Sequence, residues 1–111
     1  MENELQIQAK TIRKYKLITL TGTVGSASAE NLDRQIQKAF NRRIFNIILD
    51  LEQVNLITSA GLRVMLKTVK ECQGNNGKLK LLNVSKTLQE VFNIIGITFH
   101  VFDDLATALE N

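Results

Sequence analysis

The sequence predicts a single α/β domain with a mixed, mostly parallel sheet, an N-terminal hairpin and about four helices. Its length of 111 residues is that of one domain. Two alternating, strand-like runs come first, and segments of helical and strand character then alternate along the chain. Such alternation is typical of parallel strands joined by helical crossovers, and it leaves the strand order open.

The composition limits the classes of protein to consider. Hydrophobic residues make up 44% and charged residues 23%, as in ordinary globular domains. The net charge is only +3 and aromatic residues make up 5%, so nothing favours a nucleic-acid partner. The lone Cys72 excludes an internal disulfide. Residues 1–4 lack the features of a signal peptide, and no apolar run reaches the ~18 residues of a membrane span. We therefore expect a cytoplasmic protein.

The first half of the chain is expected to hold a hairpin, a loop, a helix and a strand. Leu5, Ile7 and Ala9 alternate with polar residues, and a second apolar run follows the polar turn. Ser28 is the expected N-cap of the first helix. The expected ranges are 5–22 for the hairpin, 21–28 for a loop rich in Gly, Ser and Thr, 29–40 for the helix and 44–51 for a strand covered on both faces.

In the second half, helical spacing begins near Ser59 and ends before the turn sequence at residues 74–77. A third helix is expected between Ser85 and Gly96, with Phe92 and Ile95 placed first in the core and second at an interface. The remaining expected elements are strands at residues 78–83 and 99–102 and a final amphipathic helix at residues 105–109.

The most informative stretch is Asp50–Val64, where a buried strand runs into a turn of small residues that opens a helix. The carboxyl end of a strand is the usual place for ligand or partner contact in α/β proteins. Free N–H groups and the helix dipole favour negative charge there. Ala60 and Gly61 leave the backbone open to close approach. Taken alone, these residues also fit a simple N-cap at Ser59 and a packing glycine at Gly61, which is the commoner arrangement.

The segment Ser59-Ala60-Gly61-Leu62-Arg63-Val64 resembles the signature of the STAS family (sulfate transporter and anti-sigma factor antagonist). Three further segments are similar to that family. Leu20–Gly22 resembles the end of its second strand, Ser28–Leu32 the start of its first helix, and Ile47–Leu51 its central strand. The chain is therefore identified as similar to one STAS domain over residues 1–111, of the anti-sigma factor antagonist type.

This resemblance implies a protein switch that is not an enzyme and needs no cofactor. In the family, the unphosphorylated domain binds an anti-sigma factor that is also a serine kinase, and phosphorylation of the motif serine breaks that complex. The matching position is Ser59, with Thr58 as a second possible acceptor. The residues that the resemblance assigns to the partner surface are Gly25, Ser26, Thr58, Ser59, Ala60, Gly61, Leu62 and Arg63.

A second interpretation stays open, because Thr58 and Gly25 stand where antagonists often carry acidic residues. In that alternative the chain is a STAS subunit or scaffold without switching, for example beside the ATPase of a lipid-transport system. Arg63 lies one turn after Ser59 and is predicted to stabilise a phosphate there. Lys67 and Lys70 share its side of the helix, which is also typical of a solvated face.

The remaining reactive residues give no sign of catalysis or metal binding. His100 is expected to be structural, and Cys72 is expected to be an inert packing thiol. Asp50 and Glu52 lack an acid–base partner and are expected to face solvent or to cap a loop. The sequence contains no nucleophile–His–acid set, no phosphate-binding loop and no dinucleotide glycine pattern.

Overall fold

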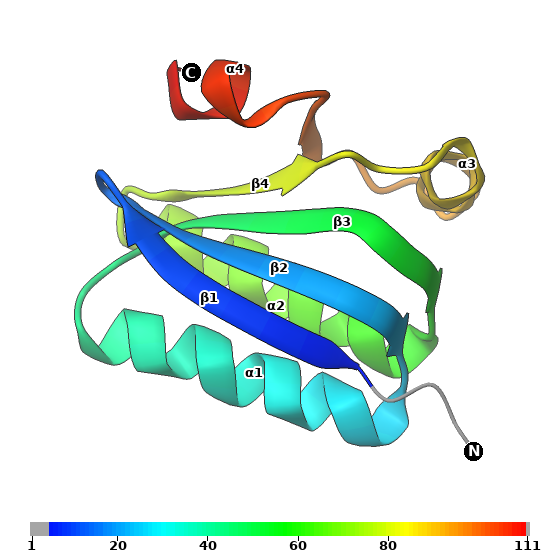
Figure 1. Ribbon diagram of the computed structural model, residues 1–111. Coiled ribbons are helices and arrows are strands. Elements are labelled where there is room, and N and C mark those ends of the chain that lie inside the picture. Colours follow the sequence, from blue (N-terminus) through cyan, green and yellow to red (C-terminus); the bar gives the residue numbers. More distant parts are fainter. Residues whose placement is uncertain (1–4, 111) are drawn as a thin grey trace.

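A computed structural model describes residues 5–110 and shows one α/β domain, which confirms the predicted fold class (Figure 1). Residues 1–4 and 111, which belong to the expected domain and include the N-terminal segment considered above, lie outside the described residues. The strands are β1 (Gln6–Ile12), β2 (Tyr15–Val24), β3 (Asn46–Ile57), β4 (Lys78–Leu82) and β5 (His100–Phe102). The helices are α1 (Ser26–Asn41), α2 (Ser59–Gly74), α3 (Lys86–Ile94) and α4 (Leu105–Glu110).

The five strands lie in the order β1-β2-β3-β4-β5. β1 is antiparallel to β2, and each later strand is parallel to its neighbour. Because β2 to β5 are parallel, their carboxyl ends share one edge of the sheet, and a helix follows each of them there. We call this the carboxyl edge, and the opposite one the amino edge.

Two long helices cover one face of the sheet. Figure 1 shows α1 and α2 beneath the sheet, α4 on the opposite side and α3 beyond the end of β4. Apolar side chains from α1, α2 and the strands form the larger core, which removes them from water. Its fully buried members include Ile18, Leu32, Ile36, Ile47, Leu49, Leu51, Cys72 and Leu81. This packing holds the helix starts against the carboxyl edge.

The short helix α4 covers a smaller core on the other face. That core consists of Tyr15, Leu17, Ile48, Leu82 and Ala108. Lys80 is buried beside it, with 1% of its surface exposed. Its Nζ donates to the Tyr15 hydroxyl at 2.7 Å and to the Ala108 carbonyl oxygen at 2.6 Å. Because a buried ammonium needs acceptors for its protons, these contacts fasten α4 to the sheet.

The predicted loop over residues 21–28 is wrong. β2 continues to Val24 and α1 begins at Ser26, so only Gly25 connects them. Gly22 has a φ of 116°, and the register of β2 on β3 shifts on both sides of it. An irregular strand can carry glycine and polar residues that otherwise indicate a loop. Ser28 is therefore the third residue of α1, and Gly25 is the N-cap.

β3 is longer than the predicted strand, because it ends at Ile57 and not at Leu51. β4 stops opposite Asp50, so beyond that residue β3 pairs with β2 alone. Polar side chains are exposed along this extension. The sequence prediction missed it because that prediction relied on continuous apolar runs. The extension carries the chain past β4 before α2 begins.

The helices of the second half follow the prediction more closely. The Ser85 hydroxyl accepts a hydrogen bond from the Leu88 backbone N–H at 3.1 Å and so caps α3. Phe92 is buried as expected, but the prediction for Ile95 is wrong, since 45% of that residue is exposed. The reason is that α3 has only nine residues, and only Leu88 and Phe92 of its apolar face are fully buried.

Candidate functional site

The candidate site lies at the carboxyl edge, where α1 and α2 begin on neighbouring strands. β2 and β3 are paired up to Val24 and Ile57, so the turns that follow them are adjacent. The predicted partner-surface residues Gly25, Ser26 and Thr58–Arg63 all belong to these two turns and their first helical turns. The structure therefore brings together residues that are more than thirty positions apart in the chain.

Thr58 joins the two turns. Its backbone N–H donates to the Val24 carbonyl oxygen at 2.9 Å, and its hydroxyl donates to the same oxygen at 3.1 Å. The Thr58 hydroxyl oxygen also accepts from the Gly61 N–H at 3.4 Å, which makes Thr58 the N-cap of α2. The simple expectation that Ser59 is the cap is therefore wrong. The Thr58 hydroxyl is fully engaged in holding the turn.

Gly61 allows α2 to begin close to β2. A Cβ atom at this position would lie 2.6 Å from Val24 Cγ1 and 2.8 Å from the Val24 carbonyl oxygen. Both distances are too short for real side-chain contacts, so residue 61 has to be glycine for this approach. Gly61 is buried, and it positions the turn against β2.

Ser59 lies between these two anchors and is exposed. It is the first residue of α2, and within residues 5–110 its hydroxyl makes no hydrogen bond. Ala60, half-buried, follows it with a single methyl group. The structure thus presents an available hydroxyl next to the unpaired N–H groups of a helix start. A phosphate on Ser59 would be favoured by the helix dipole.

The start of α1 forms the other half of the site. The Gly25 N–H donates to the Ser28 hydroxyl oxygen at 2.8 Å, and the Ser28 hydroxyl donates to the Thr23 carbonyl oxygen at 3.0 Å. These bonds fix the one-residue connection. Ser26, the first residue of α1, is exposed like Ser59, so each turn has one exposed serine.

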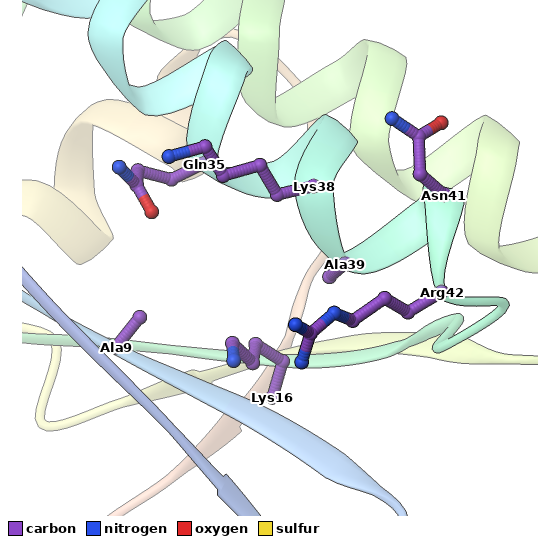
Figure 2. Close-up of a pocket in the computed structure, with 7 residues that line it drawn as sticks. All are labelled: Ala9, Lys16, Gln35, Lys38, Ala39, Asn41 and Arg42. Carbon is purple, nitrogen blue, oxygen red and sulfur yellow. The ribbon is translucent and has the colours of Figure 1, made fainter.

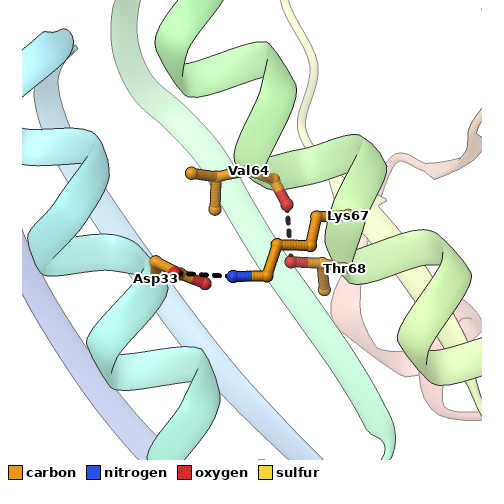
Figure 3. Close-up of polar contacts among 4 residues, drawn as sticks. All are labelled: Asp33, Val64, Lys67 and Thr68. Carbon is orange, nitrogen blue, oxygen red and sulfur yellow. Dashed lines mark hydrogen bonds and ion pairs between the residues drawn. The ribbon is translucent and has the colours of Figure 1, made fainter.

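Three cationic residues share one side of α2. One of them forms an ion pair, and the other two are exposed. Figure 3 shows Lys67 reaching across to α1, where its Nζ lies 2.9 Å from Asp33 Oδ2. In the same view the Thr68 hydroxyl donates to the Val64 carbonyl oxygen at 2.7 Å. Arg63 and Lys70 are exposed, and the described part of the chain offers the Arg63 guanidinium no hydrogen bond or ion pair. Arg63 is therefore free to take an anion one turn from Ser59.

A comparison with protein families decides the identity of the domain. Residues 6–108 match the STAS domain family. The chain belongs to the STAS family. Because the match covers nearly the whole chain, the resemblance drawn from the motif is confirmed.

Relatives of this STAS domain carry a consistent description. A Bordetella bronchiseptica protein named "Putative anti-sigma factor antagonist BtrV" is 36% identical over 77 residues, which is 69% of this chain and 66% of that protein. The anti-sigma F factor antagonist of Lysinibacillus sphaericus is 29% identical over 86 residues, covering 77% of this chain and 74% of that one. The phosphorylated form of the Bacillus cell fate determinant SpoIIAA has a TM-score of 0.78 at 25% identity, covering 95% of this chain and 97% of its own.

Exposed apolar side chains near this edge were missed by the sequence prediction. Leu56 precedes the turn of the STAS motif and is 53% exposed, and Ile94 at the end of α3 is 83% exposed. Val91 on α3 and Ile95, the C-cap residue of that helix, are exposed to a smaller extent, and α3 begins at the same edge. The sequence does contain a sign of this exposure, because α3 has more apolar residues than one helix face can bury.

The ionisable residues that the structure describes make local contacts within the fold. Asp50 Oδ1 accepts from the Glu52 backbone N–H at 3.1 Å and from Asn83 Nδ2 at 3.3 Å, so this carboxylate links β3 to the residue that follows β4. His100 is exposed on β5. Over residues 5–110, His, Cys, Asp and Glu side chains form no group of three that could hold a metal ion. In the same part of the chain, no helix is long and apolar enough to span a membrane.

Proposed function

We propose that this STAS domain is a cytoplasmic anti-sigma factor antagonist that binds an anti-sigma factor with serine kinase activity and is released by phosphorylation of Ser59. One observation carries the proposal: Ser59 has an exposed hydroxyl, without a hydrogen bond to any residue from 5 to 110, on a turn that Thr58 and Gly61 hold firmly. A rigid turn presents the same surface to each partner molecule. The names of BtrV and of the Lysinibacillus relative support the same role.

The partner surface in this proposal combines a small-residue turn with apolar neighbours. Ala60 and the exposed Ser26 leave little bulk at the edge, so that a partner backbone can approach closely. Leu56 and the exposed residues of α3 supply apolar area at its margin, as protein interfaces require. Leu62 is half-buried against the core and contributes more to holding the turn than to binding.

Phosphorylation at Ser59 changes this surface without disturbing the fold. The Ser59 Oγ attacks the γ-phosphorus of ATP, its proton is lost, an O–P bond forms and ADP leaves. The product carries about −1.5 to −2 charges and three acceptor oxygens at the centre of the docking surface. Thr58 is a poorer acceptor than Ser59, because its hydroxyl already donates to Val24 and caps α2.

Arg63 is proposed to stabilise the phosphoserine. Residues four apart lie on the same side of a helix, and a guanidinium can bind phosphate through two parallel hydrogen bonds. In the phosphorylated protein, Arg63→Ala should lower the melting temperature relative to the phosphorylated wild type. Lys70→Ala, which removes an exposed cation further along α2, is the matched control and should leave it unchanged. Equal effects of the two variants would contradict this role for Arg63.

The proposal is tested by kinase incubation and by binding measurements. With an anti-sigma serine kinase and ATP, intact mass and peptide mapping should find one phosphate on Ser59, retained in Thr58→Val and absent from Ser59→Ala. Ser59→Asp should weaken binding to the anti-sigma factor by about tenfold or more, since a charge then occupies the interface. Gln73→Glu adds a charge at the far end of α2 and should leave the affinity unchanged.

Two results would reject the proposal. One is the absence of any phosphate on the chain with kinases that modify other antagonists. The other is co-purification with a transport ATPase in a complex that Ser59→Asp does not weaken. The second result would favour the alternative of a non-switching STAS subunit.

A further inference from the structure

A pocket separates the β1–β2 hairpin from the last turns of α1, at the amino edge and away from Ser59. We call it the hairpin pocket, and its volume is about 420 Å³. Ala9 of β1 and Ala39 of α1 lie on opposite sides and leave the space open because their side chains are short. Figure 2 shows the lining side chains of β2 and α1 extending into this space from both sides.

Three cationic side chains line the hairpin pocket. Lys16 enters from β2, Lys38 lies in the last turn of α1, and Arg42 is the C-cap residue of that helix. Figure 2 shows the Arg42 guanidinium extending toward the Lys16 side chain, whose amine points toward the hairpin. Lys38 and Arg42 are four residues apart on one helix, a spacing at which like charges repel. Lys16, half-buried, adds a third positive charge from a different element.

No carboxylate compensates these cations in the part of the chain that the structure describes. None of the described residues that line the pocket is acidic, and the one salt bridge found among residues 5–110 joins Lys67 to Asp33 on another side of α1. The Lys16 amine has a neutral partner, the Thr11 hydroxyl oxygen, at 3.3 Å. The site therefore has cationic donors with capacity for an anion.

The C-terminal end of α1 repels an anion less than a helix end with unpaired carbonyl oxygens would. The Ala39 carbonyl oxygen accepts from the N–H groups of Arg42 and Ile44 at 3.0 and 2.9 Å, and the Phe40 carbonyl oxygen accepts from Arg43 at 2.8 Å. These acceptors are occupied and do not face the pocket as free lone pairs. A helix end alone accounts for cations at Lys38 and Arg42. It does not account for Lys16 or for the hollow between them.

We propose that the hairpin pocket binds an anion that carries two or more phosphate groups. Arginine and lysine are the usual protein ligands of phosphate, and three of them around one space suit a diphosphate better than a single charge. The volume lies within the range of small-molecule sites. Gln35 adds an amide donor to the lining of the pocket. This site is independent of the switch proposed at Ser59, since different residues at the opposite edge form it.

The test is a titration of the isotope-labelled chain with sodium pyrophosphate at constant ionic strength, followed by amide chemical shifts. The proposal expects saturable shifts at residues of the hairpin pocket. Lys38→Gln combined with Arg42→Gln should raise the dissociation constant by about tenfold or more, because two charge-assisted contacts are lost. Arg42→Lys should fall between wild type and Arg42→Gln, since it keeps the charge and loses the paired donors.

Lys70→Gln is the matched control, because Lys70 is an exposed cation on α2 outside the pocket. It should bind pyrophosphate like the wild type. Equal weakening by Lys70→Gln, equal binding of citrate and pyrophosphate, or the absence of saturable binding of any phosphate compound would overturn the proposal. All the substituted side chains are exposed, so the fold should persist, and circular dichroism checks this.

The phosphate groups could come from a soluble compound or from a lipid headgroup, and a second arm separates these sources. Vesicles of cardiolipin, whose headgroup carries two phosphate groups, in phosphatidylcholine are sedimented with the chain, with and without pyrophosphate. Binding of pyrophosphate alone identifies a soluble source. Sedimentation that Lys38→Gln and Arg42→Gln abolish together, with no binding of pyrophosphate, identifies the headgroup. Sedimentation that these changes leave intact, without pyrophosphate binding, would count against the pocket.

Discussion

The two ends of α2 are built alike but present very different side chains. At each end a glycine lets the chain pass close to a neighbouring segment, Gly61 against Val24 and Gly77 against Phe45. At the carboxyl edge the helix begins with the exposed hydroxyl of Ser59. At the amino edge its last turn carries the thiol of Cys72, which is fully buried.

The difference shows that rigidity alone does not mark a functional end. Both ends are tightly fixed, and Gly77 donates its N–H to the Cys72 carbonyl oxygen at 2.7 Å. Only the end at Ser59 combines a fixed backbone with a reactive group that solvent and partners can reach. Chemical change at Ser59 can therefore alter the surface, whereas change at Cys72 would disrupt the core.

The largest effect on stability is expected at Gly77, after the C-terminal end of α2. A Cβ at residue 77 would lie 1.8 Å from the Phe45 carbonyl oxygen. Because backbone would have to move, Gly77→Ala should lower the free energy of unfolding by about 3 kcal/mol. Urea denaturation measures this. Gly74→Ala, where nothing lies within 4 Å of the added atom, is the control and should not destabilise the domain. Equal stability of Gly77→Ala and wild type would show that this end is not closely packed.

Gly61→Ala should follow with a loss of about 2 kcal/mol, since the new methyl group meets Val24 at the side chain and at the carbonyl. Gly25→Ala in the neighbouring turn is the matched variant. Its Cβ would meet atoms only at 3.9 Å, so a loss below about 1 kcal/mol is expected in the same urea measurement. A larger loss for Gly25→Ala than for Gly61→Ala would mean that the turn after β2, and not that after β3, limits the site.

At the Ser59 end of α2, the sequence predicted the local features better than the contacts between residues distant in the chain. The motif at residues 59–64 and the helix start at Ser59 follow from local pattern, because capping and helical spacing involve residues close in the chain. The bonds from Thr58 to Val24 and the clash at Gly61 join residues distant in the chain, and no local pattern contains them. The strand order stayed open and the hairpin pocket was not predicted for the same reason, whereas the extension of β3 was missed because its exposed residues are polar.

Cys72 gives a prediction with a defined dependence on pH. Burial, and secondarily the charge of Glu71, raise the pKa of its thiol from 9.0 to about 12. The unfolded thiol ionises first, so this contribution to stability is complete below pH 9.0 and is lost as pH rises toward about 12. The free energy of unfolding should fall by at most about 1.4 kcal/mol per pH unit from this group.

The slope is measured against Cys72→Ala, which removes the thiol and leaves other titrating groups in place. A thiol reagent supplies an independent comparison of the two ends. Native Cys72 should not react before the protein unfolds, whereas Ser59→Cys in the Cys72→Ala background should react at once. Rapid labelling of native Cys72 would contradict its burial and remove the contrast.

The smallest effect on stability is expected at Ser59 itself. Ser59→Ala removes a hydroxyl that makes no hydrogen bond within residues 5–110, so the free energy of unfolding should change by less than about 0.5 kcal/mol. Thr58→Val, one residue earlier, removes the hydroxyl bonded to Val24 and Gly61 and should cost about 1 kcal/mol. If denaturation showed the opposite order, the Ser59 hydroxyl would be a structural cap. Its modification would then unfold the turn, and partner release would follow from lost structure and not from an altered surface.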